Sequence, residues 1–244
     1  MLRIICSLCL ICLFLLWGKQ IACAGELAER LENFPAWQKI TFVRPAVGDL
    51  TYPDWMLGDW LVKSTLVDLV APLAPEIVTP GFEGNRQYLQ VPVTFSVRFV
   101  QNNKAGKSTI VADRLFNSLN LARAYLGDAA VLAVKIDPHS PNRQITFLAG
   151  DRQLVSIVSA RATETTVDGR FIATEVFQQL FKGGRYPYFN FVESTTAYRK
   201  LPTSHPTVEA QQVTAVYLSP QDPNYFQARS RPVALYRYHL EFFR

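Results

Sequence analysis

The stretch VPVTFSVRFV, residues 91–100, alternates between apolar and polar side chains for most of its length. One face of the extended chain carries Val91, Val93, Phe95, Val97 and Phe99. The other face carries Thr94, Ser96 and Arg98. Successive side chains of a strand point to opposite sides of its sheet, so this period of two predicts a β-strand with one buried face.

Eight further runs are rich in β-branched and aromatic residues and predict more strands. They cover residues 57–70, 129–137, 143–150, 153–164, 170–181, 188–201, 207–218 and 232–243. The segments between them, such as DPHSPN, VDGR and KGGRYP, have the Gly, Pro, Asn and Asp content of turns. About nine strands joined mostly by short turns predict an antiparallel sheet.

One helix interrupts the strands, at ADRLFNSLNLARAYLGD, residues 112–128. Helical spacing places Leu115, Leu119, Ala122 and Leu126 on one face. Asp113 is the expected N-cap of this helix, and Gly127 is its expected stop.

Many meandering strands with little helix predict an all-β fold, either an antiparallel sandwich or a closed up-and-down β-barrel. QVTAVYL (212–218) and LVSIVSA (154–160) are apolar on both faces, which favours a barrel with a filled or lined interior. We therefore expect one β-barrel domain over residues 57–244, with one inserted helix and a long proline-rich loop. Residues 25–56 are expected to form a short helix, ending before Pro35, and an irregular segment.

The first 24 residues have the layout of a secretory signal peptide. Arg3 precedes an apolar run over residues 4–17, and Ala22-Cys23-Ala24 offers small residues before a cut at Gly25. The apolar run is shorter than the roughly 20 residues of a membrane span, so an uncleaved anchor is the weaker alternative. A lipoprotein cut before Cys23 is disfavoured by Gln20, which stands where such signals carry leucine. We therefore expect an exported protein.

The four cysteines, at positions 6, 9, 12 and 23, all lie in the expected signal peptide. The mature chain is then expected to have no disulfide, thiol nucleophile or cysteine metal site. The signal also carries Arg3 and Lys19, so the 25 basic residues fall to 23 against 20 acidic ones. This small and dispersed surplus argues against nucleic acid as a partner.

Gly106-Lys107-Ser108 matches the end of the nucleotide-binding P-loop, G-x-x-x-x-G-K-[ST]. The first glycine of that pattern would fall at position 101, where this chain has Gln101. β-Branched residues 109–111 also follow, where the P-loop helix should already have begun. We interpret NNKAGK as a hairpin turn in which Gly106 takes a positive φ, and we expect no nucleotide.

Patterns for catalysis and metal binding are weak. His139, His205 and His239 lie far apart, and two of them stand in proline-containing turns. The chain has no G-x-S-x-G motif, and its glutamates on the predicted strands stand singly. We expect no enzyme activity, no catalytic residues, no metal and no cofactor.

Gly58-Asp59-Trp60 opens the first long strand, and the last strand carries Arg237 and ends at Arg244. This resembles the lipocalin-like (calycin) signature, in which a G-x-W tryptophan closes one end of the barrel. In that family an arginine from the last strand packs over the indole, which is a favourable cation–π contact. The resemblance implies a buried Trp60 with Arg237 or Arg244 against its ring.

The segment DLVAPLAPEIVTPGFEGNRQYL, residues 68–89, contains three prolines and cannot be a regular helix or a central strand. It is nevertheless apolar at Val70, Leu73, Ile77, Val78 and Phe82. We expect the segment to lie against one barrel opening with these side chains facing inward. Glu83, Asn85 and Arg86 would then line the mouth.

YPDW (52–55), LPTSHPTVEAQQVTAVYL (201–218) and LYRYHLEF (235–242) are similar to an uncharacterised family of cyanobacteria and plant chloroplasts. The similarity extends from about Trp37 to the end of the chain. It implies an oxygenic phototroph, and with export it implies the periplasm or the thylakoid lumen. The family carries no known activity, so it transfers no functional residues.

Two functions fit these observations. The first is a non-enzymatic binder of a small apolar molecule, a lipid or pigment, with Trp60, Phe82, Glu83, Arg86 and Phe95 as candidate ligand-binding residues. The second is an interaction or assembly protein of the photosynthetic membrane, with a filled barrel and a membrane or photosystem-associated protein as partner. A third class, a chromophore-attaching enzyme, conflicts with export. A cavity of roughly 300 Å³ or more beside Phe95 would favour the binder.

Overall fold

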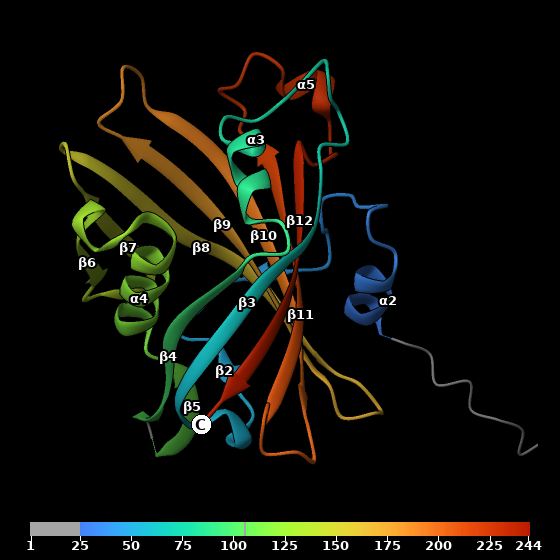
Figure 1. Ribbon diagram of the computed structural model, residues 1–244, viewed down its shortest axis with the longest axis vertical. Helices are drawn as coiled ribbons and strands as arrows, with labels where there is room; N and C mark the ends of the chain where they lie inside the picture. Colours follow the sequence, from blue (N-terminus) through green and yellow to red (C-terminus); the bar gives the residue numbers. More distant parts are fainter. Residues whose placement is uncertain (1–24, 105) are drawn as a thin grey trace, which may run out of the picture.

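The computed structural model describes residues 25–104 and 106–244 (Figure 1). The expected signal peptide lies outside the described residues.

The core of the fold is one strongly curled antiparallel sheet. Its ten longer strands are β3 (Gly58–Val70), β4 (Pro92–Lys104), β5 (Lys107–Ala112), β6 (Val131–Asp137), β7 (Ser140–Leu148), β8 (Arg152–Thr165), β9 (Phe171–Lys182), β10 (Tyr188–Lys200), β11 (Val208–Leu218) and β12 (Ala234–Phe243). Eleven strands follow the order β2-β5-β4-β3-β12-β11-β10-β9-β8-β7-β6, where β2 is Thr51–Tyr52. A twelfth, β1 (Arg44–Pro45), pairs with β8. The nine predicted strands are all present, and β5 is an additional one.

The predicted closed barrel is wrong, because the sheet is open between β6 and the β4–β5–β2 side. The chain leaves β5 through the helix α4 (Arg114–Leu126) and not through a hairpin, so β5 and β6 do not pair. Helix α4 packs instead against β4 and β6 on the open side (Figure 1). The segment that contains β1 and β2 crosses the same gap, because β1 pairs with β8 and β2 pairs with β5. The sheet is thus a half-barrel whose gap is covered by a helix and a crossing segment.

The β4–β5 hairpin confirms the interpretation of NNKAGK as a turn. Asn103 pairs with Ser108, and Gly106 has a φ of +73°. Lys107 and Ser108 belong to β5. A P-loop would place them at the start of a helix, so the partial motif has an ordinary structural explanation here.

Helix α4 has the predicted ends. The Asp113 side chain accepts a hydrogen bond from the Phe116 amide, 3.1 Å, and Gly127 takes a φ of +85° at the C-cap. Leu115 and Leu126, two of the four residues predicted to share one face, are 47% and 54% exposed. The helix turns a more polar face, with Asn117 and Tyr125, towards the sheet. The reason is that this face borders a cavity rather than a close-packed core.

The convex face of the sheet is covered by α2 (Glu26–Glu32), the predicted short helix, and by the chain that follows it. Its apolar side chains pack on β9, β11 and β12 through Leu27, Leu31, Trp37, Ile40, Ile172, Val213 and Leu235. Beneath α2 the carboxylate of Glu193 is fully buried. It forms an ion pair with Arg30, 2.8 Å, and accepts a hydrogen bond from the Tyr217 hydroxyl, 3.0 Å.

The proline-rich loop packs over the upper end of the half-barrel, against β11 and β12. Val70, which was predicted to belong to the loop, is instead the last residue of β3, an interior strand of the sheet. The loop contains the short helix α3 (Phe82–Asn85) and the 3-10 turn η2 (Arg86–Tyr88). Leu73, Ile77 and Phe82 are buried, whereas Val78, which was also expected to face inward, is 47% exposed. Thr79 lies within hydrogen-bond distance of Tyr188, 3.0 Å, so the loop is tied to the start of β10.

The remaining elements are short. They are the 3-10 turns η1 (Asp54–Met56) and η3 (Asp128–Ala130), and helix α5 (Tyr225–Ala228), which joins β11 to β12. None of the helices in the described part of the chain is both long and apolar enough to span a membrane.

Candidate functional site

The lower end of the half-barrel is closed by Trp60, which is 2% exposed. Its Nε1 donates a hydrogen bond to the Met56 carbonyl, 2.7 Å. The guanidinium of Arg244 lies 4.5 Å from the indole centroid and donates to the Leu57 carbonyl, 3.0 Å. The predicted tryptophan–arginine contact is therefore present, and its partner is Arg244.

Arg237, the other predicted partner, is on the opposite side of the sheet. Its guanidinium lies 5.6 Å from the Phe34 ring and donates to the Gln211 side chain, 3.0 Å. Because side chains alternate along β12, Arg237 faces the convex side, while Tyr238, Leu240 and Phe242 face the concave one.

A cavity of about 370 Å³ lies within the concave side, bordered by α4. Its apolar wall comes from β3, β4, β5 and β12 through Val62, Phe95, Val97, Phe99, Ala112, Leu240 and Phe242. Leu121 of α4 lines the cavity and is 42% exposed, so it marks a rim where the cavity meets solvent. Phe95 and its same-face neighbours on β4 thus line a cavity above the volume that the sequence argument required.

The remaining wall of the cavity is polar. It is formed by Tyr52, Ser64, Asn117, Tyr125, Tyr198, Gln212, Thr214 and Tyr238. Several of these groups are already fixed by neighbours. The Gln212 side chain donates to Thr214, 3.2 Å, and accepts from Thr196, 3.0 Å. Asn117 accepts from the backbone amide of Arg98, 2.6 Å, and donates to its carbonyl, 3.0 Å, which fixes α4 to β4.

The four tyrosines of this wall stay neutral over the physiological pH range. Burial raises the pKa of Tyr198 to about 12. Burial also raises the pKa values of Tyr52, Tyr125 and Tyr238 above the ordinary tyrosine value. Neutral hydroxyls both donate and accept hydrogen bonds. The wall can therefore bind an uncharged polar group without placing a charge in the cavity.

A charged cluster joins the elements that cover the open side of the sheet. Glu175 on β9 pairs with Arg114 at the start of α4, 3.1 Å, and with Arg161 on β8, 3.0 Å. Arg114 also lies 3.5 Å from Asp49 in the β1–β2 crossing. The side chains of this network are only 11–16% exposed, and two arginines balance two carboxylates. The cluster holds α4 and the crossing segment against the sheet.

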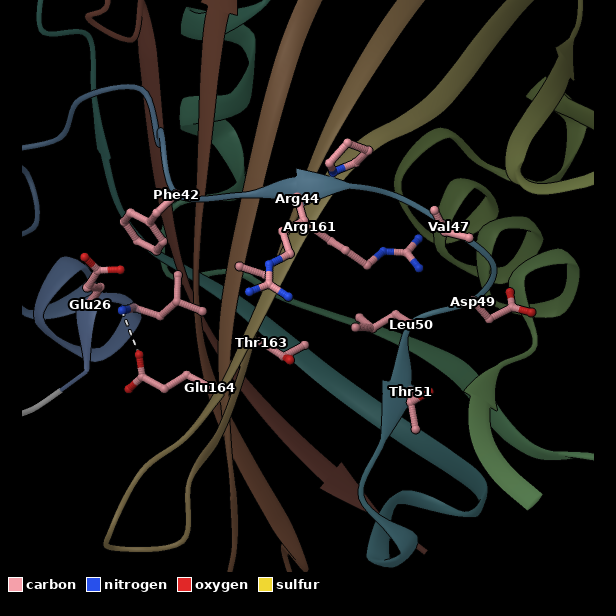
Figure 2. Close-up of a pocket in the computed structure, with 13 residues that line it drawn as sticks. Glu26, Phe42, Arg44, Val47, Asp49, Leu50, Thr51, Arg161, Thr163 and Glu164 are labelled. Atoms are coloured by element: carbon pink, nitrogen blue, oxygen red, sulfur yellow. Dashed lines mark hydrogen bonds between the residues drawn. The ribbon is translucent and has the colours of Figure 1, made fainter. Parts of the chain in front are cut away.

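A second hollow, of about 620 Å³, lies outside the cavity, between α2, the β1–β2 crossing and β8 (Figure 2). Arg44 and Arg161 line it together with Glu26, Asp49 and Glu164 (Figure 2). Glu164 is already engaged, because one of its oxygens accepts a hydrogen bond from the Leu27 amide, 2.8 Å. The hollow is larger than the concave cavity, but it is lined by charges of both signs, whereas the concave cavity is lined by aromatic, apolar and neutral polar side chains. We therefore take the aromatic concave cavity as the candidate site.

The residues predicted to bind a ligand are not gathered in one place. Phe95 lines the cavity, and Trp60 contacts it indirectly through Phe242, with ring centroids 6.2 Å apart. Phe82 is buried at the upper opening against Tyr236, 5.9 Å. Glu83 and Arg86 pair with each other on the surface, 3.0 Å, so the predicted mouth residues do not line this cavity.

The tyrosines that form the polar wall were missed. They come from β2, α4, β10 and β12, so no local motif contains them. One signal was available in LYRYHLEFF, where Tyr236, Tyr238, Leu240 and Phe242 recur with a period of two. Gln212 and Thr214 share a face of β11, and such polar residues in a lined interior are typical of a binding wall.

The fold and its cavity define a mostly β protein with a curled antiparallel sheet around a partly polar pocket. The chain belongs to the family described as a domain of unknown function, DUF6816, whose model matches residues 45–244. A search of curated proteins and of solved structures finds no significant match. Within the described ranges, no group of three or more His, Cys, Asp or Glu residues is placed to hold a metal ion.

Proposed function

We propose that this protein is a non-enzymatic binder of one small amphipathic molecule, which has an apolar body and an uncharged polar end. The observation that supports the proposal is the cavity of about 370 Å³ between α4 and the concave face. Small-molecule pockets have volumes of roughly 300–1,000 Å³ and combine apolar walls with a few placed polar groups. The phenyl rings of β4 and β12 would contact the body of the ligand, and the tyrosine wall would bind its polar end.

The small volume restricts the class of ligand. A single acyl or isoprenoid chain, or a compact ring system, fits such a cavity better than a complete two-chain lipid or a large pigment. The neutral polar wall favours an alcohol, ketone or protonated acid over a permanent ion, because an unpaired charge is costly to bury. The open rim at Leu121 provides a path by which the tail of a longer molecule could project into solvent.

We further propose that the half-barrel is a lipocalin-like fold opened by α4. The proposal is supported by Gly58 and Trp60 at the closed end, with Arg244 against the indole. Export to the periplasm or thylakoid lumen of an oxygenic phototroph is part of the same proposal. It is supported by the composition of residues 1–24 and by the similarity in sequence described above.

The binding proposal is tested with a cavity-filling substitution and a matched control. Ala112→Phe places a ring into the cavity, whereas Ala129→Phe makes the same change at an exposed position. With the methyl ester of cis-parinaric acid as an uncharged fluorescent probe, we expect Ala112→Phe to weaken binding by at least about tenfold and the control to leave it unchanged. Native mass spectrometry of the protein from its own membrane fraction should show a bound molecule of low mass.

The opposite results would support the interaction protein with a filled interior. In that case the native protein carries no small molecule, the probe does not bind, and both substitutions behave alike in the fluorescence titration.

A further inference from the structure

The upper end of the half-barrel presents exposed apolar side chains on three separate connections. These are the proline-rich loop, the β9–β10 turn and the β11–β12 connection with α5, and their tips reach the same end of the molecule (Figure 1). Phe226 beside the α5 turn is 84% exposed, Tyr186 in the β9–β10 turn is 73% exposed and Val78 in the loop is 47% exposed. Each connection thus carries one large apolar or aromatic side chain into solvent.

Basic side chains surround these three residues. Lys182 and Arg185 flank the β9–β10 turn, and Arg229 and Arg231 follow α5, all of them exposed. Within the described residues, none of the four forms an ion pair. Arg152 at the start of β8 is a fifth. The unpaired carboxylates of the same end are fewer, namely Glu76, Asp151 and Asp222. Five unpaired basic side chains against three carboxylates leave this end with a small positive surplus.

The tips are held in place by the fold. Thr79 of the loop contacts Tyr188 at the base of the β9–β10 turn, 3.0 Å. Gly183 has a φ of +88°, and a side chain there would overlap the backbone of Asp151 and Arg152, so this turn packs closely on the β7–β8 turn. Phe226 stands beside Tyr225, 5.4 Å between ring centroids, and Tyr225 packs on the cluster beneath the loop.

We propose that this upper end docks on an anionic lipid surface. Aromatic side chains settle at the level of lipid headgroups, and lysine and arginine are attracted by anionic headgroups. Three protruding tips with apolar ends, two of them with basic side chains at their bases, match a plane of headgroups. A protein partner of standard size would instead need a continuous patch of about 800 Å². The proposal goes beyond ligand binding, because it concerns an end of the molecule outside the concave cavity.

The test is co-sedimentation of the chain beginning at Gly25 with vesicles of phosphatidylcholine, with and without phosphatidylglycerol. We expect binding only to the anionic vesicles, with an affinity that falls as salt is raised. Replacing Lys182, Arg185, Arg229 and Arg231 by glutamine should weaken binding by up to about fivefold for each residue. The double variant Tyr186→Ser, Phe226→Ser should weaken it by about tenfold, because it removes the apolar side chains that enter the interface.

The control variant is Val167→Ser with Lys200→Gln. Val167 is 88% exposed, and both residues lie at the opposite end of the strands. This variant should bind anionic vesicles as the unmodified protein does.

Equal binding to neutral and anionic vesicles would overturn the proposal, and so would equal loss in the control and in the upper-end variants. The proposal would also be overturned, in favour of a protein partner, if the protein binds native membranes but not pure lipid vesicles and if protease treatment of those membranes abolishes the binding. Each of these results is independent of whether the concave cavity binds its probe.

Discussion

Replacing Arg30 by methionine should destabilise the protein strongly, because it leaves a buried carboxylate without its cation. Glu193 is fully buried under α2, and Arg30, whose side chain is 13% exposed, is its ion-pair partner. Breaking a buried pair in this way costs about 3–5 kcal/mol. For a domain of this size each kcal/mol shifts Tm by about 2–4 °C, so Tm should fall by roughly 6–20 °C. Thermal denaturation followed by circular dichroism measures this shift directly.

The exposed pair Arg199–Glu209 supplies a matched control. Arg199→Met removes the same charge from a side chain that is 55% exposed, and such pairs contribute about 0–1 kcal/mol. Combining Arg30→Met with Glu193→Gln should restore a large part of the lost stability, because the uncompensated charge is gone while the amide still accepts from Tyr217. If Arg30→Met and Arg199→Met lower Tm to within about 2 °C of each other, the reasoning is refuted.

Three further changes have defined outcomes. Phe82→Ala should lower the free energy of unfolding in urea by about 3–5 kcal/mol, because the ring is buried at the upper opening. The same change should leave probe binding unchanged. Val78→Ala, at an exposed position, should change the free energy of unfolding by no more than about 0.5 kcal/mol. Gly183→Val should cost about 1–3 kcal/mol, because a Cβ there overlaps the backbone of Asp151 and Arg152; an unchanged Tm would show that the β9–β10 turn can shift. Stability should fall between about pH 10 and pH 12. In the folded protein Tyr198 keeps its proton up to a pKa of about 12, whereas in the unfolded chain a tyrosine loses its proton near pH 10. Ultraviolet difference spectra that show every tyrosine titrating near pH 10 would contradict this prediction.

The strands could be predicted because their signal is local. Residues 91–100 alternate between apolar and polar because one face of the strand is buried. In the structure this strand is β4, and Phe95, Val97 and Phe99 lie on its concave side. The resemblance predicted that Arg237 or Arg244 would contact Trp60, and Arg244 does so because the start of β3 pairs with the end of β12.

The opening of the barrel could not be predicted in the same way. Closure depends on whether β5 reaches β6, and they do not pair because α4 follows β5 and packs against β4 and β6. The orientation of α4 could not be predicted either. A helix that borders a cavity need not bury its most apolar stripe, and Leu115 and Leu126 remain in solvent.

The candidate site was predicted in part, through its apolar half. Phe95 belongs to a strand whose alternation is visible in the sequence, whereas the tyrosine wall is assembled from four elements distant along the chain. The proline-rich loop drew attention to Glu83 and Arg86 because they follow an apolar segment. In the structure they satisfy each other at the surface, which is the usual outcome for charges three residues apart on a helical turn.

The position of β12 determines when the chain can fold. This last strand is not at an edge: it stands fifth in the order, between β3 and β11, and pairs Phe243 with Leu61 at one end and Leu235 with Val70 at the other. The strands from β6 to β11 are joined as successive hairpins, but β3, β4 and β5 connect to them in the sheet only through β12. A chain that stops early therefore loses the middle of its sheet and is left with two fragments whose unpaired strand edges favour aggregation.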